Sequence, residues 1–306
     1  MATETDLDIK SLLDSIEPLI NTMHYGKANI GLSPAGEHVV TSIKYQGLLQ
    51  MRKEFIQRLT SSIVRYVLSK SKYAANQDVL RGEGFDQSDA EAEIFQQASG
   101  YFRKSDIKGQ FSELLLFNLL QYYFEAIPVV RKMQITTNTE LERNGADAIH
   151  LGQLDTKEYC VYLGEAKTYP SGFVPAFKNA VQSIIKAHAE HRDELQLHSY
   201  GDFLEPKVKA IMKDYLSGAI DLPVKLVIII SYCTGETPTL ATKEEYTQHY
   251  IDQVLAECKK ITVTHYKDAE GNAIHPGLLK ELHYILFPVN ELDKLLKDFQ
   301  TKLGIK

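Results

Sequence analysis

The chain lacks long hydrophobic runs and has few cysteines. Each of these features argues against one class of protein. Its longest continuous apolar segment, residues 226–230, is far shorter than the roughly 20 residues that a membrane-spanning helix needs. The acidic opening, MATETDLDIK, has no apolar core and does not resemble a secretory signal. The three cysteines form no C-x-x-C pair, which argues against a disulfide framework or a zinc cluster. We expect a cytoplasmic protein with no membrane segment.

Phosphate-binding glycine loops and an excess of positive charge are also missing. The sequence contains no Walker A loop, no G-x-G-x-x-G and no G-x-S-x-G, which argues against ATP or dinucleotide chemistry in this chain. Its 34 basic residues are outnumbered by 40 acidic ones, for a net charge of -6. Because binding to nucleic-acid phosphates needs positive charge, such a function requires a local positive field, a partner or controlled exposure of the site.

The composition, 44% hydrophobic and 24% charged over 306 residues, is that of a globular protein with a large core. Residues 1–105 are expected to be mostly helical after a strand-like or irregular opening. Helical spacing of apolar residues continues over residues 45–72. A loop rich in glycine and acid follows at residues 81–89, and Asp86 or Ser88 is expected to cap the next helix.

The second part, residues 106–306, has the alternating rhythm of an α/β domain. An apolar helix comes first, followed by three strands with short polar connections that predict antiparallel hairpins. A long helix and a continuously apolar strand, expected to be buried on both faces, complete this core. The expected strands are residues 129–137, 146–152, 159–167, 224–232 and 283–289. Thr242 with Glu245 predicts a capping box, and Asn290 is expected to cap the last helix.

The segment YCVYLGEAKTYPS carries the clearest chemical signal. Side chains two positions apart on a strand point to the same face, so Glu165 and Lys167 are expected to lie side by side. A carboxylate can hold a hard divalent cation. An ammonium beside it can position an attacking water or neutralise charge that develops on a phosphate. Alone, an E-x-K pair on a strand is more often a solvated ion pair.

Two further acids precede this pair. Asp147 begins an apolar strand, where an ionised side chain is costly unless a cation satisfies it. On a neighbouring antiparallel strand it can converge with Glu165 on one Mg²⁺, which Mn²⁺ is expected to replace. Glu113, one of few charges in its helix, suits a third carboxylate for the same metal. Each acid alone has a plainer explanation, and the order of all four residues carries the prediction.

This order of residues resembles the PD-(D/E)XK nuclease superfamily. The motif consists of Gly109-x-x-x-Glu113, then Asp147, then Glu165-x-Lys167, followed by a helix. The resemblance implies a restriction-endonuclease-like α/β core, a mixed sheet flanked by helices, with an N-terminal mostly helical subdomain. It also implies that Asp147 and Glu165 bind Mg²⁺, that Glu113 helps to place the metal, and that Lys167 assists the chemistry.

One position departs mildly from this resemblance, and another adds to it. Ala146 stands before Asp147 where the superfamily often has proline. Gln182, on the following helix, matches the place where many members add a polar active-site residue.

More narrowly, the pattern GADAIHL, then YLGEAKTY, then a helix and an apolar strand resembles the HamA nuclease effectors of Hachiman anti-phage systems. This resemblance implies a helicase partner, HamB, that restrains the nuclease until infection or DNA damage is sensed. It also implies unspecific degradation of DNA after release. An acidic nuclease with weak affinity of its own for DNA is consistent with such restraint.

Two other functions stay open. The chain can be a non-catalytic scaffold or sensor that binds a helicase and keeps a vestigial site. It can also be a nuclease for RNA, because the chemistry of this site does not distinguish ribose from deoxyribose. His188, Glu190 and His191 have a spacing that zinc can use, but nothing completes such a site, so solvated helix residues are expected there.

Overall fold

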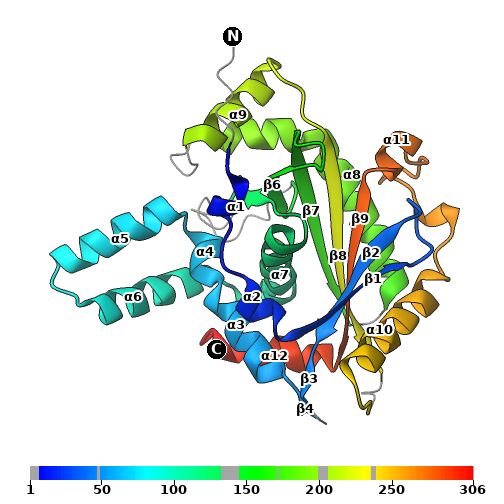
Figure 1. Ribbon diagram of the computed structural model, residues 1–306, viewed down its shortest axis with the longest axis horizontal. Coiled ribbons are helices and arrows are strands. Elements are labelled where there is room, and N and C mark those ends of the chain that lie inside the picture. The colour runs from blue at the N-terminus through cyan, green and yellow to red at the C-terminus, as the bar shows by residue number, and fades with distance from the viewer. Residues whose placement is uncertain are drawn as a thin grey trace.

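A seven-stranded mixed sheet runs through the centre of the computed structural model, which describes residues 7–46, 49–131, 145–170, 172–198, 206–235 and 239–305 (Figure 1). Its strand order is β1-β2-β9-β8-β7-β6-β5. The strands are β1 (Met23–Asn29), β2 (Glu37–Ile43), β5 (Ile127–Pro128), β6 (Ala148–Gln153), β7 (Tyr159–Tyr169), β8 (Val224–Thr234) and β9 (Leu282–Asn290). The central strands β2, β9, β8 and β7 are parallel, and β1, β6 and β5 pair antiparallel to their neighbours.

Strand β8 divides the core into two layers. Its residues 226–230 are fully buried, as the continuous apolar run predicts. Successive side chains alternate between the faces, so Ile228 and Ile230 join one hydrophobic cluster while Val227 and Ile229 join the other. A parallel central strand needs helices on both faces for this burial.

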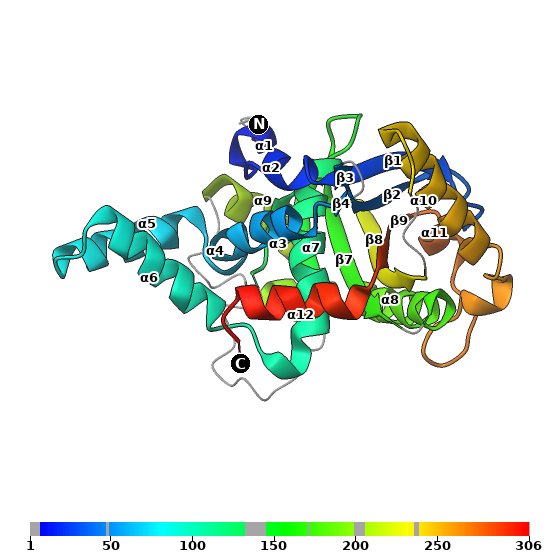
Figure 2. The ribbon, with the colours of Figure 1, turned by 90° about the horizontal axis from the view of Figure 1, so that it is seen from below.

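Helices cover both faces of the sheet (Figure 1, Figure 2). One face carries α3 (Arg52–Ser61), α4 (Ile63–Val67), α7 (Ile107–Tyr123) and α12 (Leu292–Lys302). The other carries α8 (Phe173–His198), α9 (Pro206–Ser217) and α10 (Lys243–Cys258). Helix α7 is apolar on nearly all sides because β7 covers one side while α4 and α12 contact others. Across the described ranges, no helix combines the length and apolarity of a membrane span.

Shorter elements complete the chain. They are α1 (Ile9–Leu12), α2 (Glu17–Ile20), the β3 (Tyr45–Gln46) and β4 (Leu49–Gln50) pair, and α11 (Pro276–Leu279). Helices α5 (Lys70–Gly82) and α6 (Gln87–Ser99) form a hairpin, the helical arm, that projects from the body (Figure 1). The arm has a small core of its own around Leu80, Ala90 and Ile94.

The first 105 residues contain the expected strand-like opening and helices, arranged differently from the prediction. Strands β1 and β2 belong to the main sheet, because β2 pairs with β9. The helical spacing over residues 45–72 is only partly matched: the chain forms β3 and β4 first and then three helices, with breaks at Ser62 and Leu68. Helical spacing of apolar residues indicates which side chains are buried. It does not reveal a break in the helix when the residues on both sides of the break stay buried. The domain boundary at residue 105 stays a prediction.

Most of the later elements agree with the sequence. Strands β6, β7, β8 and β9 lie where expected within about two residues, and the Thr242–Glu245 capping box forms. The loop before α6 is shorter than predicted, and Asp86 caps that helix. Of the strand expected over residues 129–137, the structure has β5 two residues earlier, and residues 132–137 lie outside the described ranges.

The prediction that Asn290 caps the last helix is wrong. Asn290 is the final residue of β9, where its side chain accepts a hydrogen bond from Thr234 and donates one to Tyr45. Glu291, with φ 51°, is the residue that precedes α12. The amide side chain is therefore used to join strands, and the helix begins without a side-chain cap.

Gly164 lets α7 lie directly against β7, which makes it a sensitive position. A Cβ atom there meets Leu116 Cδ2 at 2.8 Å and Ala148 Cβ at 3.1 Å. We expect Gly164→Val to lower the free energy of unfolding by about 1–3 kcal/mol through overpacking. Gly82→Ala is the matched control, because its Cβ meets open space. Urea unfolding of both variants checks this, and equal stability of the two contradicts it.

Candidate active site

Glu165 and Lys167 form an ion pair near the end of β7. Lys167 Nζ lies 2.7 Å from Glu165 Oε1. The Glu165 side chain is 4% exposed and that of Lys167 is 27% exposed, so the pair sits at the border between core and solvent. The prediction that these two side chains share one face of the strand is confirmed.

Asp147 lies beside this pair on the neighbouring chain segment. The antiparallel β6–β7 register ends at Ala148 opposite Gly164, and Asp147 comes just before it. The Asp147 backbone N–H donates to the Gly164 carbonyl at 2.9 Å, so Asp147 and Ala148 both lie against Gly164. The Ala166 N–H donates to Asp147 Oδ2 at 2.9 Å and fixes the direction of that carboxylate. Asp147 therefore contacts the β7 backbone on both sides of Glu165, and the convergence of the two carboxylates on one metal stays a prediction.

Glu113 approaches the same end of β7 from the opposite layer. It lies one helical turn before Leu116, the α7 residue that contacts Gly164. The hydroxyl of Tyr66, on α4, donates to Glu113 Oε2 at 3.0 Å. Tyr66 thus links the helix acid to a part of the chain that sequence reasoning did not connect with the site.

We call Glu113, Asp147, Glu165 and Lys167 the acidic cluster. The pKa shifts of two residues reflect its negative charge. Burial raises the pKa of Tyr66 well above its ordinary value, and the charges of Glu113 and Asp147 raise it further. Tyr66 therefore stays a protonated donor. Burial by itself lowers the pKa of Lys167, but the charge of Glu165, its hydrogen bond and the charge of Asp147 outweigh burial and raise the pKa. Lys167 is thus an ammonium at neutral pH.

The residues fit a divalent cation through two carboxylates rather than three. Asp147 is hydrogen-bonded to the backbone on both sides of Glu165, and both acids offer hard oxygen ligands. One or two carboxylates are what Mg²⁺ usually takes from a protein. Within the part of the chain that the structure describes, no three His, Cys, Asp or Glu residues gather closely enough to hold a metal. Glu113 therefore does not form a three-ligand group with Asp147 and Glu165. The role of Glu113 in positioning the metal stays a prediction.

Glu194 is a further acid at this site that sequence reasoning missed. Its side chain comes from α8 and is buried, and its Oε2 accepts the Ala146 backbone N–H at 3.0 Å. Gly145 has a φ of 119°, and a Cβ there collides with the Glu194 carboxylate. Glu194 therefore holds the turn that delivers Asp147. No local motif marks it, because its partner lies 48 positions earlier in the chain.

Two side chains on α8 differ from their expected roles. Gln182 donates to the Asp268 carbonyl at 3.1 Å, so its amide is engaged by a distant loop. One turn earlier, Asn179 donates to the hydroxyl of Tyr169, two residues beyond Lys167 on β7. His191 is not the solvated residue that was expected: it is buried and its Nε2 lies 2.8 Å from the Tyr215 hydroxyl.

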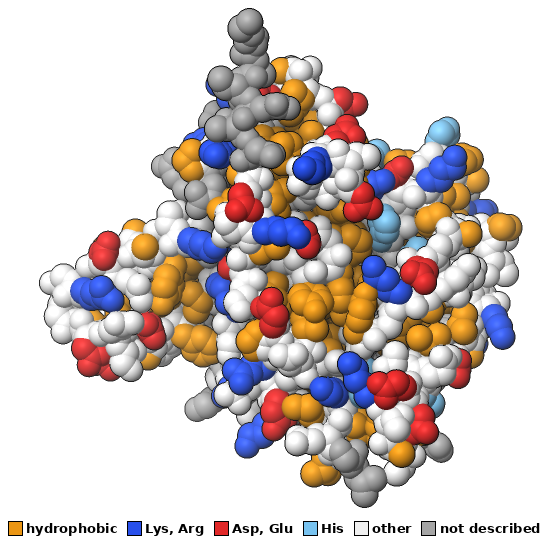
Figure 3. Space-filling model, viewed as in Figure 1, with side chains coloured by type: hydrophobic (Ala, Val, Ile, Leu, Met, Phe, Trp, Pro, Cys, Tyr) orange, Lys and Arg blue, Asp and Glu red, His pale blue; other side chains and the backbone are white. Residues whose placement is uncertain are grey.

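Acidic and basic side chains are interspersed over the face shown in Figure 3 (Figure 3). Both signs are abundant in the sequence, which has 34 basic and 40 acidic residues. Affinity for a polyanion over this face therefore depends on particular basic side chains rather than on a broad field.

The model of the family described as HamA matches residues 21–303, nearly the whole chain. No curated protein matches it at significant similarity.

The contact between Glu194 and Ala146 can be tested without an activity assay. We expect Glu194→Ala to leave the buried Ala146 N–H without its acceptor and to lower the free energy of unfolding by about 1–3 kcal/mol. Hydrogen exchange in the peptide around Ala146 is expected to become faster. Glu194→Gln keeps an acceptor oxygen and serves as the conservative control. Unchanged exchange in the alanine variant contradicts the role of Glu194 in holding this turn.

Proposed function

Because the chain belongs to the HamA family, we propose that it is a metal-dependent nuclease that cleaves DNA as the effector of a Hachiman anti-phage defence system. The observation that supports this most strongly is that Asp147 is hydrogen-bonded to the β7 backbone on both sides of Glu165, at Gly164 and Ala166. Lys167 contacts the Glu165 carboxylate itself. We further propose that this cluster is the active site of a PD-(D/E)XK core.

Each residue of the cluster has a task in the proposed reaction. Asp147 and Glu165 hold Mg²⁺, which when bound supplies positive charge to the scissile phosphate. Lys167, kept as an ammonium by the neighbouring acids, orients the attacking water or neutralises charge on the phosphate. Glu113 adds a third negative charge near the cation, and Tyr66 fixes the direction of its carboxylate.

The balance of charge favours this assignment. The carboxylates of Glu113, Asp147 and Glu165, with Glu194 close by, outnumber the one ammonium of Lys167. The excess of negative charge attracts a divalent cation and repels a polyanion. A site of this kind binds DNA weakly until the cation is present. A helicase partner that delivers or exposes DNA is consistent with this requirement, and we propose HamB as that partner.

The proposed site is tested by removing charge from Glu165. With Mg²⁺ or Mn²⁺, the purified chain, alone or with its helicase, is expected to degrade linear or supercoiled DNA, and EDTA stops it. Glu165→Gln is expected to reduce the rate by about 10²-fold or more, because the metal loses a ligand. Glu281→Gln, in the Lys225–Glu281 pair near the start of β8, is the matched control and is expected to cleave normally.

The contradicting results are specific. Equal cleavage by Glu165→Gln and the parent assigns the activity to another site. A parent that cleaves neither DNA nor RNA with its helicase present, and that binds no Mn²⁺ by calorimetry, favours the scaffold function instead. Cleavage of RNA but not DNA in the same assay favours the RNA-directed alternative.

Tyr66 is expected to act through Glu113 rather than on the substrate. Tyr66→Phe removes the hydrogen bond to Glu113 and is expected to raise the Mg²⁺ concentration for half-maximal cleavage several-fold, about 3- to 10-fold. The rate at saturating Mg²⁺ is expected to change less, and stability to fall by about 1 kcal/mol. A metal titration identical to that of the parent contradicts this positioning role.

A further inference from the structure

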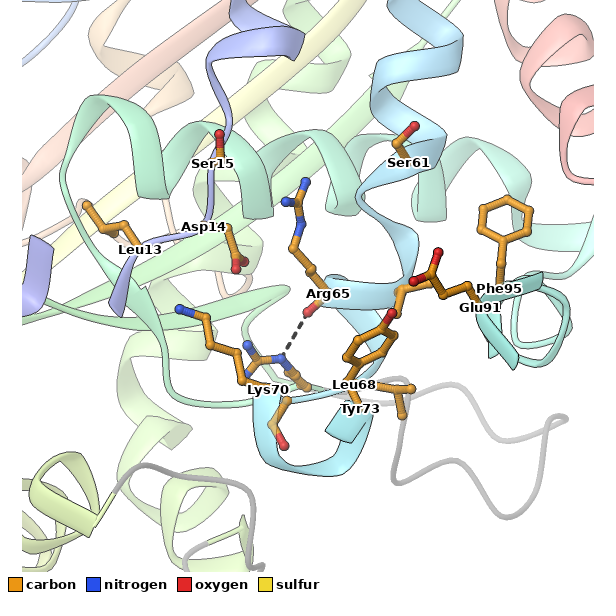
Figure 4. A pocket seen from close by; sticks show the side chains of 13 residues that line it. Leu13, Asp14, Ser15, Ser61, Arg65, Leu68, Lys70, Tyr73, Glu91 and Phe95 are labelled. Atoms are coloured by element: carbon orange, nitrogen blue, oxygen red, sulfur yellow. Dashed lines mark hydrogen bonds between the residues drawn. The ribbon is translucent and has the colours of Figure 1, made fainter. Parts of the chain in front are cut away.

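A pocket of about 620 Å³ lies at the base of the helical arm (Figure 4). Its walls come from the connection between α1 and α2, from α4, from the start of α5, from α6 and from Arg131. None of the four candidate active-site residues lines it. The volume falls within the range of sites that bind small molecules.

Arg131 places a largely desolvated positive charge in this wall. Its Nε donates to the Arg65 backbone carbonyl at 3.1 Å, and its guanidinium lies 6.0 Å from the centre of the Phe117 ring. Burial lowers the pKa of Arg131 to about 10, so the group is still charged at neutral pH. Asp14 acts on it only at longer range, and no carboxylate of the described residues forms an ion pair with it. A buried guanidinium without a paired anion is costly.

Two more cations line the same pocket. The Arg65 guanidinium makes no hydrogen bond or ion pair with the rest of the described chain. The Lys70 ammonium donates to the Leu12 carbonyl at 3.2 Å, and this uses one of its three N–H groups. Asp14 and Glu91 are the acids in the lining, so the lining holds three cations and two carboxylates. The pocket is thus suited to an anion.

The opposite part of the lining is aromatic. Tyr73 on α5 and Phe95 on α6 line the pocket from the arm (Figure 4). The Tyr73 hydroxyl accepts a hydrogen bond from Gln77, which helps to fix the ring. Aromatic rings of this kind can stack on a planar heterocycle. A bare anion leaves these rings uncovered, and an apolar ligand leaves the guanidiniums without an anion.

We propose that this pocket binds a nucleoside monophosphate group, with the phosphate on Arg65, Lys70 and Arg131 and the base against Tyr73 and Phe95. The group can be a free nucleotide or the 5′-phosphorylated end of a nucleic-acid strand. The carboxylates of Asp14 and Glu91 offer acceptors for hydroxyl or amino groups of the ligand. The inference goes beyond the proposed nuclease function, because a nucleotide can bind here whether or not the cluster around Glu165 is catalytic.

Calorimetry with the full chain in EDTA, where metal-dependent cleavage is stopped, tests this site. The titrants are dAMP, deoxyadenosine, inorganic phosphate, and one short single strand with either a 5′-phosphate or a 5′-hydroxyl. We expect dAMP to bind more tightly than deoxyadenosine or phosphate. Arg65→Gln is expected to weaken dAMP binding about 10-fold or more by removing a charge-assisted contact. Because the Arg65 side chain makes no hydrogen bond or ion pair with the described residues, we expect this variant to keep the fold. Arg131→Gln is the second variant.

Arg81→Gln is the matched control, because Arg81 is an exposed arginine at the far end of α5. Tighter binding of the 5′-phosphorylated strand supports a strand end as the ligand, and equal binding of both strands supports a free nucleotide. The proposal is overturned if the parent binds neither dAMP nor the phosphorylated strand, if Arg65→Gln binds as the parent does, or if phosphate binds as tightly as dAMP. These outcomes are independent of DNA cleavage.

Discussion

The antiparallel pairing of β6 with β7 places Asp147 against the backbone on both sides of Glu165. The Asp147 N–H donates to the Gly164 carbonyl, and its Oδ2 accepts the Ala166 N–H. The pairing in turn depends on close packing, because Gly164 has no side chain to keep α7 away from the sheet. A shift by one residue would reverse the faces of the β6 side chains and change where Asp147 meets β7. The chemistry proposed for the chain therefore depends on this register.

The surroundings of the cluster hold it from both layers of the molecule. On one side, Glu194 of α8 binds the backbone just before Asp147. On the other side, Tyr66 of α4 binds Glu113 of α7. Helix α4 also contributes Arg65 to the pocket beneath the helical arm. Consecutive residues of one short helix thus face the candidate active site and the proposed nucleotide site, so these two regions are structural neighbours.

Much of this arrangement could be predicted from the sequence because the relevant signals are local. Alternation over residues 159–167 predicts β7 and the shared face of Glu165 and Lys167, and the apolar run predicts β8. Contacts between distant segments leave no such signal. The hydrogen bond of Glu194 and the membership of β1 and β2 in the main sheet depend on long-range packing. Asn290 was misassigned for a related reason: an amide that suits a helix cap also suits a bond between strands.

The central claim is that Asp147 and Glu165 share one divalent cation, and anomalous scattering from crystals soaked in Mn²⁺ tests it most directly. The account predicts one strong peak within coordination distance of both carboxylates, roughly 2.0–2.5 Å, that disappears in Glu165→Gln. A Mn²⁺ ion bound elsewhere, or no ion at this pair in crystals whose Mn²⁺ concentration supports cleavage in solution, contradicts it.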